Sequence, residues 1–143
     1  ETTRLCEVYS VEKAVQFDFD LTQLNGGKIG TLNEYSENYL ALSPLPAALT
    51  ARFSPRALAT ADRFNDSAAD YALLTKTLGA DIRDMEGGAI VQAAKSAGVP
   101  AYSFKAISDV AGSGSTTDQY LKNRAAALEN LEKALPGIFA AIG

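Results

Sequence analysis

The amino-acid sequence predicts an α/β fold, because strand-like and helix-like segments alternate along most of its length. After residue 56, short apolar segments are separated by stretches with helical periodicity, and a β-rich segment precedes them. Strands joined by single helices predict a parallel sheet covered on both faces. A chain of 143 residues with 47% hydrophobic and 21% charged residues can bury the core of one globular domain.

The first segment contains three predicted strands. Residues 15–22 alternate strictly between apolar and polar side chains, as a half-buried strand does, and residues 5–11 are expected to form another strand. The turn sequence at 25–27 (Asn-Gly-Gly) favours a hairpin back to a short strand at 28–32. Three prolines within residues 33–55 predict an irregular or briefly helical stretch.

The alternating segment contains three predicted strands and three predicted helices. The strands are expected at 56–61, 80–85 and 101–107, and the helices at 66–78, at 87–97 and from Thr116 onward. Asp66 is expected to cap the first helix, Gly79 and Gly98 to end the first two, and Thr116 with Gln119 to form a capping box. Pro136 predicts a kink or break in the last helix.

The composition excludes several classes of function. The sequence has no histidine and one cysteine, which excludes His-based triads, Cys–His pairs and zinc sites, so no metal or cofactor is expected. The net charge is −4 with scattered Lys and Arg, so nucleic acid is not an expected partner. The sequence lacks an apolar run of roughly 20 residues and cannot form an internal disulfide, which predicts no membrane contact and a reducing, cytoplasmic location.

Ligands of parallel α/β sheets bind beyond the carboxyl ends of the strands, and this rule selects three segments. They are residues 62–65, 84–87 and 108–109, which are expected at the same edge of the sheet. Acidic residues there can also be helix caps or turn residues, and an aromatic or methionine side chain can be core filling. The glycines at 87–88 either let a ligand approach the backbone or allow close helix packing.

Several of these segments resemble a known family. The run Asp-Met-Glu-Gly-Gly-Ala at 84–89 and the later run Ala-Ile-Ser-Asp-Val-Ala at 106–111 resemble the purine nucleoside phosphorylase and nucleosidase superfamily. The resemblance is greatest to the methylthioadenosine/S-adenosylhomocysteine nucleosidases, whose motifs residues 18–22, 60–65 and 118–121 also resemble. It implies a three-layer fold with a mixed central sheet, and a role in methionine salvage.

The resemblance also implies roles for individual residues. Glu86 is expected to bind the ribose hydroxyls, which suits the two acceptor oxygens of a carboxylate. Asp109 is expected to protonate the leaving purine at N7, with Ser108 orienting it. This acid is needed because a purine anion is a poor leaving group, so the pKa of Asp109 is expected to be raised by burial.

The remaining candidates are expected to shape the pocket. By the same resemblance, Met85 lines the sugar, Phe64 stacks on the base, and backbone groups at Asn65 read the purine edge. Asp84 stands where the nucleosidases often have glutamate, which leaves the 5′ substituent of the substrate open.

The predicted activity is hydrolysis of the N-glycosidic bond of a purine nucleoside. Residues 1–143 are interpreted as the C-terminal part of a single domain whose first strands are missing, because the chain starts at Glu1 and family members carry a further N-terminal part. A truncated sheet exposes strand edges, so the N-terminal part or a partner chain, and a homo-oligomer such as a homodimer, are expected. The alternatives are phosphorolysis by the same fold, a non-catalytic nucleoside-binding module, and an inactive fragment.

Overall fold

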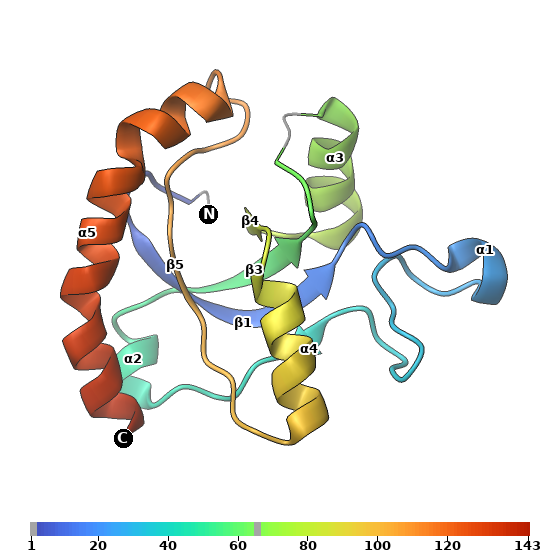
Figure 1. The fold of residues 1–143 in the computed structure, drawn as a ribbon, viewed down its shortest axis with the longest axis horizontal. Helices are drawn as coiled ribbons and strands as arrows, with labels where there is room; N and C mark the ends of the chain where they lie inside the picture. Colours follow the sequence, from blue (N-terminus) through green and yellow to red (C-terminus); the bar gives the residue numbers. More distant parts are fainter. Residues whose placement is uncertain (1–2, 65–66) are drawn as a thin grey trace.

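The computed structural model describes residues 3–64 and 67–143, in which a mixed sheet lies between helices (Figure 1). The sheet has five strands, with the order β2-β1-β3-β4 and with β5 paired to β1. Their bounds are Val8–Gln16 for β1, Leu40–Ala41 for β2, Pro55–Thr60 for β3, Ile82–Asp84 for β4 and Phe104–Ala106 for β5. Strands β1, β3 and β4 are parallel, whereas β2 and β5 pair antiparallel with β1.

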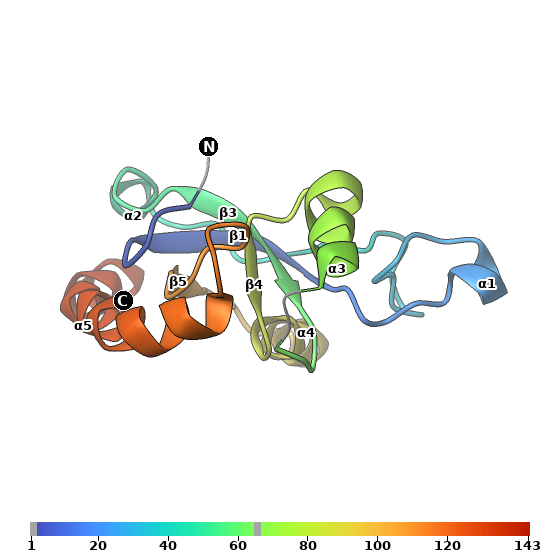
Figure 2. The same ribbon diagram turned by 90° about the horizontal axis from the view of Figure 1, so that it is seen from above.

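The helices cover both faces of this sheet. Their bounds are Thr22–Asn25 for α1, Ala47–Thr50 for α2, Ala68–Ala72 for α3, Leu73–Leu78 for the π-helix η1, Gly87–Ala97 for α4 and Thr116–Ile142 for α5. Figure 2 shows α4 and α5 on one side of the sheet and α2 and α3 on the other, which confirms the three-layer α/β fold. Within the described ranges, no helix combines the length and the apolar character needed to cross a membrane.

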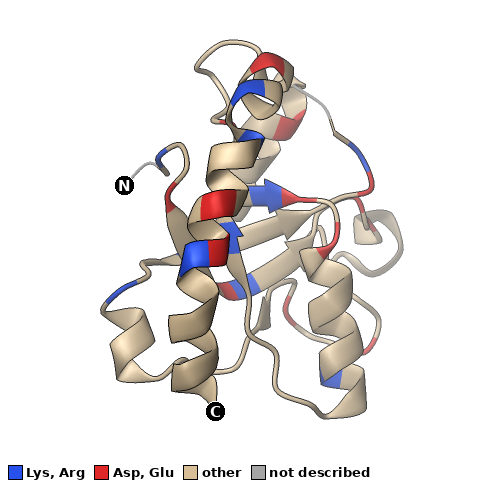
Figure 3. Cartoon of the chain, turned by 60° about the vertical axis from the view of Figure 1, so that its left-hand side comes forward, with Lys and Arg blue, Asp and Glu red and all other residues tan. Residues whose placement is uncertain are grey.

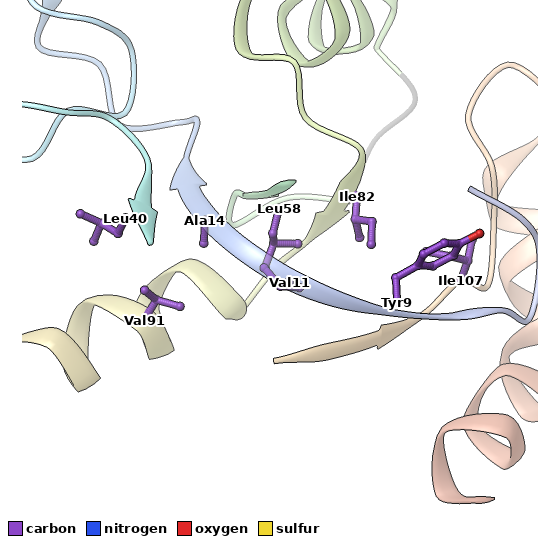
Figure 4. Packing of buried hydrophobic residues seen from close by; sticks show 8 residues of the cluster. All are labelled: Tyr9, Val11, Ala14, Leu40, Leu58, Ile82, Val91 and Ile107. Carbon is purple, nitrogen blue, oxygen red and sulfur yellow. The ribbon is translucent and has the colours of Figure 1, made fainter. Parts of the chain in front are cut away.

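Apolar side chains fill the spaces between these layers. Figure 4 shows the cluster between the sheet and α4, which consists of Tyr9, Val11, Ala14, Leu40, Leu58, Ile82, Val91 and Ile107. The cluster on the opposite face consists of Val15, Phe17, Ala59, Ala61 and Leu74. A third cluster joins α2 to α5 and consists of Leu49, Phe53, Ala134 and Ile138. Burial on both faces fixes the orientation of β1 and β3.

Parts of the two strands predicted at 5–11 and 15–22 belong to one strand with a bulge. The register of β1 against β3 shifts between Val11 and Lys13, and such an extra residue reverses the facing of every side chain after it. Val11 therefore packs on the α4 side, whereas Val15 and Phe17 pack on the opposite side. The strand predicted at 15–22 is wrong for most of its length, because β1 ends at Gln16.

The strand predicted at 28–32 is not present, and a helical turn stands near it. The carboxylate of Asp20 accepts a hydrogen bond from Thr22 N at 2.8 Å, which starts the short helix α1. Gly30 then donates from its backbone N to Phe19 O at 2.8 Å with a φ of 85°. These local bonds replace the pairing expected of a hairpin. The irregular stretch predicted at 33–55 contains only β2 and α2 as regular elements.

Two of the three predicted helices end at the predicted glycines. Helix α4 has the predicted bounds, and Gly98 ends it in the left-handed conformation. The helix predicted at 66–78 begins as α3 with Ser67 as its N-cap and continues as η1 to the left-handed Gly79. The expected cap, Asp66, lies outside the described residues.

The last helix differs from the prediction in its N-cap, and the break that was one of the two possibilities at its proline is not present. Ser115 is the N-cap, and its side chain accepts from Asp118 N at 3.2 Å, so the predicted capping box of Thr116 and Gln119 is wrong. Helix α5 continues through Pro136 to its end, so it does not break there. Packing of Ile138 in the cluster between α2 and α5 holds the turn that follows the proline.

The third predicted parallel strand is antiparallel. Strand β5 pairs with the start of β1, where Ala106 lies opposite Val8. The ammonium of Lys105 nevertheless lies 2.6 Å from the carboxylate of Asp84, the last residue of β4. This ion pair joins β5 to the carboxyl end of β4 and brings the two loops that follow them together.

Candidate active site

The predicted site residues line one cavity. It has a volume of about 1100 Å³, and its walls include Phe64, Met85, Glu86, Ser108 and Asp109. Its size is slightly above the usual range of about 300–1,000 Å³ for small-molecule sites. Asn65, the sixth predicted residue, lies outside the described residues.

An aromatic wall forms one part of this cavity. The rings of Phe64 and Tyr120 lie with centroids 5.9 Å apart at an angle of 58°. The side chains of Phe64, Tyr120 and Met85 are 47%, 38% and 41% exposed, so apolar surface faces the cavity. Exposed aromatic and apolar surface around a hollow suits a flat apolar ligand that covers it.

Asp109 is half-buried at the end of the segment that follows β5. The hydroxyl of Ser108 donates a hydrogen bond to Oδ2 of Asp109 at 2.7 Å. This bond fixes one carboxyl oxygen, and no described residue bonds to the other. The arrangement suits a carboxyl group that must keep one orientation toward a reacting atom.

Glu86 occupies the N-cap position of α4, but its side chain does not cap the helix. The side chain is exposed and lines the cavity. Across residues 3–64 and 67–143, no hydrogen bond or ion pair involves this carboxylate. Both of its oxygens are therefore available to hydroxyl donors of a ligand.

Asp84 lies in the same wall but is fully engaged with the protein. Its Oδ1 accepts from Thr60 Oγ1 at 2.6 Å, and its Oδ2 accepts from Gly87 N at 2.8 Å. Oδ2 also lies 2.6 Å from Lys105 Nζ. Asp84 therefore fixes the junction of β3, β4, β5 and α4, and it has little capacity left for a ligand.

The two glycines after Glu86 serve close packing. A Cβ on Gly87 would lie 2.5 Å from Leu58 Cδ2, and a Cβ on Gly88 would lie 2.9 Å from Thr60 Cβ. Gly88 N also donates to Thr60 Oγ1 at 2.8 Å. The start of α4 therefore lies directly on β3, which favours the packing explanation over a ligand approaching the backbone.

Two cations of the cavity are paired with acids other than Glu86 and Asp109. Arg63 forms two hydrogen bonds to Asp70, which raise the pKa of its guanidinium, and Lys105 is paired with Asp84. Figure 3 shows acidic and basic residues interspersed over the fold. In the described parts of the chain, the carboxylates of Glu86 and Asp109 take part in no ion pair.

A sequence profile of the phosphorylase superfamily matches residues 7–140. The chain belongs to the phosphorylase superfamily. A search of curated proteins gave no match.

Solved structures with the same fold include nucleosidases. A putative 5′-methylthioadenosine/S-adenosylhomocysteine nucleosidase from Francisella philomiragia has a TM-score of 0.79 and 22% identity, over 95% of this chain and 64% of that chain. A corresponding putative enzyme from Borrelia burgdorferi, bound to adenine, has a TM-score of 0.77 and 19% identity, over 92% and 60%. Futalosine hydrolase of Helicobacter pylori has a TM-score of 0.76 and 19% identity, over 94% and 61%.

This phosphorylase-superfamily chain thus spans less than two thirds of the length of these relatives. The similarity, at 19–22% identity, shows a shared fold.

Helix α5 contributes three residues that the sequence did not assign to the site of this superfamily member. Tyr120 forms the aromatic wall with Phe64. The amide group of Gln119 bonds to the backbone of Val110 through both its oxygen and its nitrogen, at 3.1 Å each. Asn123 Nδ2 donates to Ser108 O at 3.2 Å. The resemblance of 118–121 to the family's last helix covers Gln119 and Tyr120 but not Asn123.

Proposed function

We propose that the complete protein hydrolyses the N-glycosidic bond of a purine nucleoside and releases the free base. The observation that carries this proposal is the placing of Glu86, Asp109 and the Phe64–Tyr120 wall around one cavity. A purine nucleoside offers a complement to each: a vicinal diol for the free carboxylate, a basic ring nitrogen for the acid, and a flat ring for the aromatic wall.

The roles that we propose for Glu86 and Asp109 follow from the hydrogen bonds of their carboxyl groups within the protein. The carboxylate of Glu86 has no partner among the described residues, and it binds the 2′- and 3′-hydroxyls. Asp109 has one oxygen held by Ser108 and directs the other toward N7 of the base. By the family resemblance, Met85 packs against the sugar, and the backbone at Asn65, which lies outside the described residues, reads the purine edge.

The reaction that we propose is a displacement with a cationic sugar in the transition state. The bond between C1′ and N9 breaks, and its electron pair goes to the purine while Asp109 transfers its proton to N7. A water oxygen then bonds to C1′ and releases a proton to solvent, and Asp109 takes up a proton from solvent, which restores the acid. Protonation stabilises the leaving group, so the acid lowers the barrier for this step.

Two kinds of relative support this substrate class. One similar structure is a putative methylthioadenosine/S-adenosylhomocysteine nucleosidase with adenine bound, and another is a futalosine hydrolase. We propose an adenine nucleoside with a 5′-thio substituent as the substrate, in agreement with the resemblance of residues 84–89 and 106–111 to the nucleosidase motifs.

The proposal is tested by the product that the complete protein forms without phosphate. Methylthioadenosine in a phosphate-free buffer should yield adenine and the free reducing sugar, and added phosphate should not change the rate. Proton and phosphorus NMR distinguish this sugar from a sugar 1-phosphate. Base release that requires phosphate and yields the sugar 1-phosphate would replace hydrolysis with phosphorolysis.

A further inference from the structure

Two amide side chains of α5 hold the backbone on both sides of Asp109. Gln119 Nε2 donates to Val110 O and Gln119 Oε1 accepts from Val110 N, each at 3.1 Å. Asn123 Nδ2 donates to Ser108 O at 3.2 Å. The residue before the acid and the residue after it are therefore both bonded to one helix.

The sheet does not hold this part of the chain. Strand β5 ends at Ala106, and the last backbone bonds between this segment and the strand region are those of Ile107 with Cys6 and Glu7. The loop that follows contains Gly112 and Gly114, both with positive φ. Residues 108–110 thus lie between the end of a strand and a glycine-containing loop, and α5 supplies the fixed support.

Helix α5 is suited to this task because it is itself anchored. Ser115 caps its first turn, and Ala127, Ala134 and Ile138 are buried on its inner face. Gln119 lies one turn after the N-cap, and its backbone N donates a helical hydrogen bond to Ser115 O at 3.1 Å. Gln119 and Asn123, here called the clamp, therefore project from a rigid element. Precise placement of a catalytic group requires such a support.

We propose that Gln119 and Asn123 are positioning residues that hold Asp109 in the orientation needed for proton transfer. This inference rests on the proposed function. Neither side chain is assigned a contact with substrate, and both act through the backbone of residues 108–110. Since misplacement of a catalytic group by about 1 Å can cost on the order of 100-fold in rate, loss of the clamp should impair the acid step.

The test compares two substrates in the complete protein. The variants are Gln119→Met, which keeps the length of the side chain, and Asn123→Leu. The matched control is Asn130→Leu, because Asn130 is on the same helix and also donates to a backbone carbonyl, that of Cys6 at 2.9 Å. The substrates are a purine nucleoside and a nitrophenyl riboside, whose leaving group departs without protonation.

The expected result is a loss confined to the substrate that needs the acid. Gln119→Met and Asn123→Leu should lower kcat for the purine nucleoside by about 10- to 100-fold, with KM and the nitrophenyl riboside rate within about threefold of wild type. Added to Asp109→Asn, Gln119→Met should cost little more, because residues that act as one unit are not additive. Asn130→Leu should leave both rates within about threefold.

Equal losses on both substrates, or a full additive loss on top of Asp109→Asn, would show that the clamp is merely structural and would overturn this inference while the proposed function stands. If Gln119→Met does not fold, as judged by its thermal transition, Asn123→Leu decides the question alone. A wild-type protein that cleaves neither substrate would refute the proposed function itself, and this inference with it.

Discussion

The carboxylates of Asp84, Glu86 and Asp109 line one cavity but differ in their capacity to bind a ligand, because they have different hydrogen-bond partners in the protein. Asp84 is bonded to a hydroxyl, a backbone N–H and an ammonium, so it serves the fold. Asp109 is bonded to one hydroxyl, and Glu86 makes no bond with the described residues. The residue that is most available is thus assigned to substrate binding, and the residue that is partly held is assigned to catalysis.

Glu86→Gln should weaken binding of ribosides much more than binding of 2′,3′-dideoxy analogues. A hydrogen bond to a charged group contributes about 1.5 to 3 kcal/mol, which corresponds to roughly 10- to 100-fold in Kd for the riboside. Calorimetric titration of Asp109→Asn, with and without Glu86→Gln, measures both ligands without turnover. Glu34→Gln, at an exposed position away from the cavity, is the control. Equal weakening of both ligands would contradict a bond between Glu86 and the sugar.

At the scale of elements, the start of α4 is fixed by contact with β3. Thr60 is buried, and its hydroxyl both donates to Asp84 and accepts from Gly88 N. Gly88 approaches Thr60 so closely that a side chain would collide with it. This contact sets the position of Glu86 at the N-cap, so packing and ligand binding depend on the same junction.

Gly88→Ala should therefore destabilise the protein, although alanine favours helices. Its Cβ would lie 2.9 Å from Thr60 Cβ, and overpacking of this kind typically costs about 1 to 3 kcal/mol in the free energy of unfolding. Gly137→Ala is the matched control, since its Cβ would meet only the flexible end of Arg52 and should leave stability unchanged or raise it by up to about 1 kcal/mol. Urea unfolding of both variants gives the comparison. A Gly88→Ala protein as stable as wild type would refute the packing explanation.

The sequence predicted those elements whose signals are local. Helix α4 lies between a strand signal and Gly98, and its bounds were predicted correctly. The N-cap of α5 was misplaced because Ser115 and Thr116 are both good caps, and because Gln119 bonds to Val110 instead of its own helix end. Such long-range partners leave no periodic pattern in the sequence, which is also why the clamp and the aromatic partner of Phe64 were not predicted.

At the scale of the whole molecule, the cavity is assembled from segments that are far apart in the chain. Spacing alone does not reveal the direction of a strand, so the antiparallel course of β5 was not predicted. The predicted convergence nevertheless holds, because the pair of Lys105 and Asp84 brings the segment after β5 to the carboxyl end of β4. The family motifs predicted these site residues, and the roles of those residues stay predictions.

The central claim is that this assembled cavity uses Asp109 as a general acid, and Asp109→Asn tests it most directly. Asparagine keeps the shape and can donate a hydrogen bond, but it has no transferable proton. General acids contribute about 100- to 10,000-fold, so the complete variant protein should bind a purine nucleoside within a few-fold of wild type and cleave it at least about 100-fold more slowly. A nitrophenyl riboside should lose much less of its rate. Cleavage of the purine nucleoside at nearly the wild-type rate would contradict the account, because Asp109 would then be a turn residue and not the proton donor.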